Sequence, residues 1–276
     1  MNDLVSLMNE RSIAALKITD FIGAEVIGLD LSKELDFETT YIIKQLLLEH
    51  LVLVIRNQPI SLDRLEEVGS IWGNLMPHPA AKIAIPNHPS VLVVQSKTTH
   101  HRGGGLDWHS DLSCILKPPS VSVLQVVDTP PTGGDTLFIN MYETYNSLHD
   151  SIKETIEHLF SIHSNSKSFH SAPGALSTLQ PIVRIHPDTK RKCLYISTSF
   201  TESIVDMSNE KSQILLDMLN KHVLSRLDYR LCVKWQLNTI TIWDNQCTIH
   251  KAIWDYAPYI RTGYRVTAVG DIPYGS

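Results

Sequence analysis

The hydrophobic and polar positions of the chain follow two periods, one typical of helices and one of strands. Apolar residues recur at helical spacing in three segments, 36–49, 61–72 and 208–224. Asp36 is a capping residue in front of the first predicted helix, and Gly73 ends the second. Asn140 followed by Glu143 resembles a capping box, which predicts a further helix running toward Phe160.

Short apolar runs between these helices predict strands. They are 51–55, 91–94, 121–127, 136–139, 182–185, 194–197, 229–235, 239–243 and 264–269. Many short strands with few helices favour a protein that is mainly β with flanking helices (α+β), built on a double-stranded β-helix (jelly-roll) core. A doubly wound sheet would need helices alternating regularly with strands. No repeat or linker divides the chain, so we expect a single domain over residues 1–276.

Composition and charge exclude several function classes. The 276 residues include 24 Lys and Arg against 29 Asp and Glu, and the resulting net charge of −5 disfavours a nucleic-acid partner. The longest apolar run, 51–55, is too short to span a bilayer, and residues 1–17 lack the apolar core of a signal peptide. The four cysteines lie far apart, as expected for reduced thiols. We therefore expect a cytoplasmic protein with no membrane partner.

A candidate metal site begins in the segment Asp107-Trp-His109-Ser-Asp111. Read as a strand, it places His109 and Asp111 two residues apart on one face, where both can hold the same ion. The other histidine with an acidic residue two positions later is His186, before Asp188. Pro187 and the polar residues that follow assign that pair to a hairpin turn.

A third metal ligand is expected from His250, which follows the predicted strand 239–243. Two imidazoles and one carboxylate leave half of an octahedral ion open, as in non-haem Fe(II) oxygenases. Zinc hydrolases use similar sets, but the chain has no H-E-x-x-H helix. On spacing alone, the alternative that His109 and His250 are ordinary buried or surface histidines is equally good.

Two arginines after this histidine are candidate anion ligands. Arg261 and Arg265 follow His250 by 11 and 15 residues. A buried guanidinium is costly unless an anion meets it, and its planar fork matches a carboxylate or sulfonate. If Arg261 held one end of a dicarboxylate whose other end chelates the metal, the co-substrate would be 2-oxoglutarate. The alternative is a pair of surface arginines facing Asp255 or Asp271.

Ordered motifs along nearly the whole chain resemble the taurine dioxygenase-like (TauD/TfdA) Fe(II)/2-oxoglutarate-dependent dioxygenases. They are Gly23 to Gly28, His109-x-Asp111, Gly133-Gly-Asp-Thr136, Arg184 to Pro187, Phe200 to Asp206, Trp243-Asp-Asn245, His250, Asp255-Tyr256, Arg261, Arg265-Val-Thr and Gly270-Asp271. Such an ordered set is far more specific than the spacing of three ligands.

The resemblance implies iron ligation by His109, Asp111 and His250, with 2-oxoglutarate and O2 as co-substrates. Thr136 and Arg261 would hold the distal carboxylate of 2-oxoglutarate. The implied reaction oxidises a C–H bond of a small anionic substrate, a sulfonate, alkyl sulfate or carboxylate, and converts 2-oxoglutarate to succinate. A homo-oligomer, dimer or tetramer, is also expected.

The resemblance also implies a substrate pocket. Arg265 would bind the acidic group of the substrate, and four further pocket positions correspond to His78, Ser168, Phe169 and Phe200. For both phenylalanines the alternative is core packing.

Two departures from the family pattern concern the substrate. Taurine-cleaving relatives carry a tyrosine and an asparagine where this chain has Ala81 and Gly105, and the loss of both polar contacts predicts against taurine. One alternative function is natural-product tailoring, by hydroxylation, desaturation or oxidative decarboxylation of an amino-acid-derived acid. Another is a non-catalytic jelly-roll protein that binds a metal.

Overall fold

The computed structural model describes residues 2–77, 84–95, 107–166 and 176–276. The helices in these ranges are α1 (Asn2–Glu10), α2 (Phe37–His50), α3 (Leu62–Ser70), α4 (Met141–Asn146), α5 (Asp150–Ile156) and α6 (Asn209–Ser225). None of the helices described has the length and apolar character needed to cross a membrane. All four cysteines are free thiols.

Half of the described strands belong to a mixed eight-stranded sheet with the order β1-β2-β3-β14-β6-β16-β5-β4. Its strands are β1 (Ala14–Lys17), β2 (Ala24–Ile27), β3 (Val52–Ile55), β14 (Thr239–Asp244), β6 (Pro119–Asp128), β16 (Thr262–Val269), β5 (His88–Gln95) and β4 (Ala84–Ile85). All neighbours pair antiparallel except β2 and β3, which are parallel.

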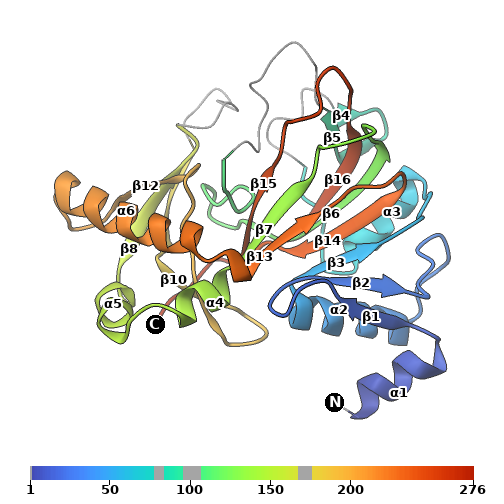
Figure 1. Ribbon diagram of the computed structural model, residues 1–276, viewed down its shortest axis with the longest axis horizontal. Coiled ribbons are helices and arrows are strands. Elements are labelled where there is room, and N and C mark those ends of the chain that lie inside the picture. The colour runs from blue at the N-terminus through green and yellow to red at the C-terminus, as the bar shows by residue number, and fades with distance from the viewer. Residues whose placement is uncertain (1, 78–83, 96–106, 167–175) are drawn as a thin grey trace.

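Three smaller sheets complete the described strands. Their orders are β13 (Arg230–Val233), β7 (Thr136–Asn140), β15 (Thr248–Ala252); β12 (Thr201–Ile204), β8 (Phe160–Ser164), β9 (Ser177–Pro181); and β10 (Val183–Ile185), β11 (Lys192–Leu194). Figure 1 shows α6 beside β8 and β12 on one side of the molecule, with α2 and α3 on the other.

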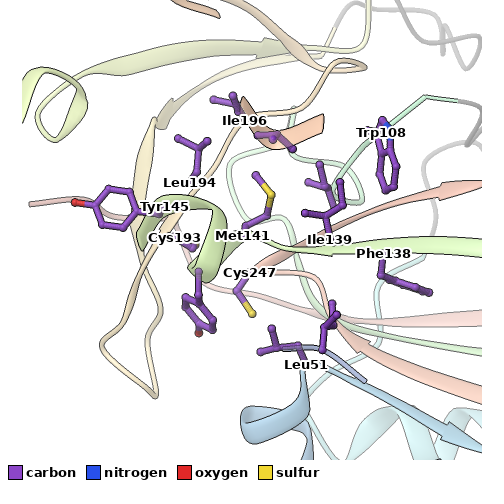
Figure 2. Close-up of a cluster of buried hydrophobic side chains, with 14 of the residues drawn as sticks. Leu51, Trp108, Phe138, Ile139, Met141, Tyr145, Cys193, Leu194, Ile196 and Cys247 are labelled. Carbon is purple, nitrogen blue, oxygen red and sulfur yellow. The ribbon is translucent and has the colours of Figure 1, made fainter. Parts of the chain in front are cut away.

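Alternating side chains of the eight-stranded sheet supply two separate cores. On β3, Val52 and Val54 join a cluster with Phe138 of β7 and other residues of the β13-β7-β15 sheet. The neighbouring residues Leu53 and Ile55 point the opposite way and join the buried faces of α2 and α3. The eight-stranded sheet is therefore covered by the β13-β7-β15 sheet on one face and by α2 and α3 on the other. Figure 2 shows Phe138, Ile139 and Met141 within the first cluster.

The structure confirms a mixed α+β protein with several sheets, and three predicted helices match α2, α3 and α6 within a few residues. Asp36 caps α2 and accepts a hydrogen bond from the backbone N–H of Thr39, as its position predicted. Asn140 likewise caps α4 through the N–H groups of Tyr142 and Glu143.

Three predictions of secondary structure were wrong. The helix expected from Asn140 toward Phe160 is two short helices, because the chain turns after Asn146 and His149 caps a new helix, α5. The strand expected over 194–197 ends at Leu194. The strand expected over 107–111 is only a single bridge at His109, because the backbone enters a turn at Asp111 and Leu112 adopts a positive φ of 47°.

Candidate functional site

A two-residue bridge joins the predicted metal ligands that lie far apart in the sequence. The N–H of His109 donates to the carbonyl of His250 at 3.0 Å, and the N–H of His250 donates back to the carbonyl of His109 at 2.8 Å. His250 lies on β15 and pairs with Phe138 of the central strand β7. This pairing sets the two imidazoles side by side, with ring centroids 4.2 Å apart.

Asp111 is held by the loop that follows β14. The side-chain oxygen of Asn245 accepts from the N–H of Asp111 at 2.7 Å, while the Asn245 amide donates to the carbonyls of Asp111, at 3.2 Å, and of Pro119, at 2.9 Å. The Ser122 hydroxyl donates to Oδ2 of Asp111 at 2.8 Å. A buried asparagine therefore replaces the strand partner that a true strand at 107–111 would have had.

The three predicted ligands converge on one point. Oδ1 of Asp111 lies 3.9 Å from Nε2 of His109 and 3.8 Å from Nε2 of His250, and the three ligand atoms all lie within 4.8 Å of one another. Nδ1 of His109 lies 2.8 Å from the carbonyl of Asp107, which can only accept, so Nδ1 carries the proton and Nε2 presents its lone pair. Two imidazole nitrogens and a carboxylate fit a first-row divalent metal ion.

The electrostatics of the cluster suit such an ion. Burial lowers the pKa of both His109 and His250, which favours the neutral imidazole that binds metals. Burial would raise the pKa of Asp111, but its neighbours, above all the charge of Arg265, outweigh it and hold that pKa below its usual value. The carboxylate is therefore ionised and ready to bind a cation.

Two other groups of metal-binding residue types lie in the described part of the chain. In one, Nδ1 of His186 accepts from the backbone N–H groups of Asp188 and Thr189, and Nε2 lies 2.9 Å from Asp244. His186 thus holds the predicted turn. The other group, Asp63, Glu66 and His88, is partly exposed.

Arg265 makes a contact that the sequence did not predict. Its Nη1 lies 2.8 Å from Oδ1 of Asp111, the same oxygen that faces both imidazoles. Nε of Arg265 is buried and has no hydrogen-bond partner among the described residues. The alternative of a surface arginine therefore does not hold for Arg265.

Arg261 is also buried, at 5% exposure, rather than on the surface. Its Nη1 donates to the carbonyl of Gly134, and its guanidinium lies 6.0 Å from the ring centre of Trp235. Burial lowers the pKa of Arg261, and the Tyr256 and Asp135 side chains oppose that shift. Thr136 opens β7 two residues after Gly134, and its hydroxyl accepts from the indole N–H of Trp235 at 3.0 Å. The structure thus brings Thr136 and Arg261 together around one indole.

Of the four further residues predicted for the substrate pocket, the structure describes only Phe200. Phe200 is buried, and its ring meets His109 edge-on with centroids 6.3 Å apart, so it lies beside the cluster. His78, Ser168 and Phe169 lie outside the described residues, as do Ala81 and Gly105.

Sequence reasoning missed Asn245, Ser122 and Trp235 as parts of the site. Asn245 stands inside the Trp243-Asp-Asn245 motif, which was a usable signal. No pattern marked Ser122 or Trp235, because each looked like an ordinary residue in or near a strand.

The chain is similar to known proteins over nearly its whole length. The model of the family described as taurine catabolism dioxygenase TauD, TfdA family, matches residues 13–267. An alkylsulfatase of Acinetobacter baylyi is 30% identical over 94% of this chain and 86% of its own length. An alpha-ketoglutarate-dependent sulfate ester dioxygenase of Pseudomonas putida is 31% identical over 92% and 88%. The crystal structure of a taurine dioxygenase from Burkholderia xenovorans gives a TM-score of 0.86 at 31% identity, covering 96% of this chain and 91% of that one.

Proposed function

The chain belongs to the TauD/TfdA family and is an alpha-ketoglutarate-dependent dioxygenase, and from this premise we propose that it uses Fe(II) to oxidise a C–H bond of a small anionic substrate. The observation that carries the proposal is the convergence of His109, Asp111 and His250 in one buried cluster. When bound there, Fe(II) supplies the oxygen chemistry, in which O2 and 2-oxoglutarate yield the oxidised substrate, succinate and CO2.

The protein's contribution is to position the reactants and exclude water. His109 and His250 present ring nitrogens from two backbone segments locked by their bridge, and Asn245 fixes the backbone of Asp111. The cluster is buried beneath Phe138 and Trp243, whose rings pack against His250. Water exclusion strengthens each electrostatic contact in such a site.

For the co-substrate, we propose that Arg261 and Thr136 bind the distal carboxylate of 2-oxoglutarate. A buried guanidinium beside a hydroxyl is a site for an anion. Both groups lie at the Thr136 end of β7, the strand whose Phe138 pairs with the ligand His250. A dicarboxylate could therefore reach from this end of the strand toward the metal ligands.

For the substrate, we propose an alkyl sulfate, a sulfonate or a carboxylate, bound through its acidic group to Arg265 and against Phe200. The buried, unpartnered Nε of Arg265, in the part of the chain that the structure describes, supports an anion at this position. The names of the sulfate-ester and taurine dioxygenases among the relatives support the same class. His78, Ser168 and Phe169 stay predictions for this pocket, as does natural-product tailoring.

We further propose a single domain with a jelly-roll core formed by the eight-stranded sheet and the β13-β7-β15 sheet. The shared core between these sheets supports it. Membership of an enzyme family speaks against a non-catalytic metal-binding protein. The homo-oligomer and the cytoplasmic location stay predictions.

The test is succinate formation by the purified protein with Fe(II), ascorbate, 2-oxoglutarate and a panel of alkyl sulfates, sulfonates and carboxylates. We expect succinate coupled to consumption of at least one anion. Activity should be lost in His250→Ala and kept in His88→Ala, which alters a histidine paired with Glu66 outside the cluster. Turnover that survives His250→Ala, or that prefers neutral analogues of the same acids, would contradict the proposal.

A further inference from the structure

Trp235 lies beside both residues proposed to bind the distal carboxylate, and no sequence motif pointed to it. It lies just beyond β13, whose Val233 pairs with Thr136 of β7. The indole N–H donates to the Thr136 hydroxyl at 3.0 Å, and the indole ring lies 6.0 Å from the guanidinium carbon of Arg261. One half-buried side chain therefore links a threonine and an arginine that are 125 residues apart.

The direction of the Trp235 hydrogen bond favours a donor role for the Thr136 hydroxyl. An indole N–H can only donate, so the Thr136 oxygen accepts and its own hydrogen must point elsewhere. The guanidinium of Arg261 is also a pure donor. With Trp235 donating to one lone pair, the Thr136 hydroxyl can turn its hydrogen toward a ligand, and beside the donor Arg261 this arrangement suits a carboxylate.

We propose that Trp235 is a positioning residue for 2-oxoglutarate, which orients the Thr136 hydroxyl as a donor and packs against Arg261 so that the pair selects a distal carboxylate. This inference rests on the proposed roles of Thr136 and Arg261. Its energetic basis is preorganisation, because a hydroxyl already turned toward the ligand does not have to leave another acceptor when the ligand binds.

The test compares two metal-chelating 2-oxo acids by anaerobic titration of the Fe(II)-loaded protein, read from the metal-to-ligand charge-transfer band. 2-Oxoglutarate has a distal carboxylate, and 2-oxopentanoate has the same chain length without one. In Trp235→Phe, which keeps the ring but loses the N–H, we expect the Kd for 2-oxoglutarate to rise roughly 5- to 10-fold. The Kd for 2-oxopentanoate should stay unchanged, whereas a general loosening of the fold would raise both.

Three further variants distinguish an error in the proposed co-substrate site from an error in the proposed role of Trp235. Trp235→Phe should add little to the loss already caused by Thr136→Val, because both remove the same interaction. Trp72→Phe, in the cluster beneath α3, controls for the loss of an indole elsewhere. If Thr136→Val and Arg261→Met leave 2-oxoglutarate binding unchanged, the proposed co-substrate site is wrong. If they weaken it but Trp235→Phe does not, or if the Trp235 and Thr136 losses add fully, only the role of Trp235 is overturned.

Discussion

Arg265 donates to the oxygen of Asp111 that faces both imidazoles, with Nη1 and Oδ1 2.8 Å apart. The arginine proposed to bind the substrate is thus bonded directly to a proposed metal ligand. An anion that attracts the guanidinium also changes the hydrogen bonding of that ligand. If Arg265 binds the substrate as proposed, substrate binding is coupled to the proposed metal site through this one side chain.

Replacing Arg265 with alanine should separate substrate binding from co-substrate binding. We expect the variant to bind 2-oxoglutarate but to lose the change in the charge-transfer band that the substrate causes, because Arg261 is intact. Removing one partner of a buried ion pair should also destabilise the protein by roughly 3 to 5 kcal/mol, measured by urea unfolding at pH 7. If Arg265→Ala instead abolishes 2-oxoglutarate binding, the roles of the two arginines are exchanged.

Asn245→Ala should weaken metal binding without removing a ligand. The variant loses the hydrogen bonds to the backbone of Asp111 and to Pro119, so the carboxylate is no longer held toward the imidazoles. We expect a 10- to 100-fold rise in the Kd for Mn(II), the range typical of residues that orient ligands. Asn146→Ala, at an exposed position, is the matched control. Equal Mn(II) affinity in both variants would show that Asn245 has no orienting role.

Gly133→Ala should impair 2-oxoglutarate binding through the backbone. Gly133 has a φ of +77°, and a Cβ there would lie 2.4 Å from the Asp255 oxygen that accepts from the N–H of Gly134. Gly134 in turn accepts from Arg261, so we expect the KM for 2-oxoglutarate to rise on the order of 10-fold.

Gly73→Ala is the control for Gly133→Ala, since its φ is also positive, +129°, but its Cβ would meet no atom within 4 Å. Both variants should lose about 1 to 3 kcal/mol of stability to backbone strain. An unchanged KM in Gly133→Ala would separate this turn from the co-substrate site.

His163 should make the protein less stable as the pH falls. Burial lowers its pKa to about 3, and it lies 2.9 Å from the Ser113 hydroxyl and 3.1 Å from that of Thr201. In the unfolded chain this histidine takes up a proton near pH 6.5. Between pH 6.5 and about 3 the unfolded chain therefore binds more protons than the folded protein, and the free energy of unfolding decreases as the pH is lowered.

The variant His163→Gln removes the contribution of His163 to the pH dependence of stability. Although less stable at pH 7, the variant should lose roughly 3 kcal/mol less than the wild type between pH 7 and pH 4, measured by urea unfolding. Parallel losses in the two proteins would mean that His163 is protonated in the folded state.

The sequence predicted where α2 and α4 begin because their caps are local signals. Asp36 and Asn140 each bond to N–H groups two or three residues later, so the residues that decide these helix starts are neighbours in the chain. The break before His149 was missed because a histidine is not among the usual capping residues. The strand at 107–111 was wrong because the backbone of Asp111 bonds to the Asn245 side chain, 134 residues away, and not to a neighbouring strand.

The sequence predicted the candidate metal ligands and anion-binding residues of the site but not the contacts between them. His109, Asp111 and His250 could be named from spacing and motif, but the backbone bridge that brings the two histidines together depends on the pairing of distant segments. The Arg265 contact with Asp111 and the Trp235 contact with Thr136 are side-chain geometry, which spacing along the chain does not encode.

The most direct test of the central claim is an anaerobic titration of the protein with Fe(II) in the presence of 2-oxoglutarate, followed at the metal-to-ligand charge-transfer band. We predict a band that saturates at one Fe(II) per chain, disappears in His109→Ala and in His250→Ala, and persists in His88→Ala. Absence of the band in the wild type, or its survival without His250, would contradict a metal centre built from these three side chains.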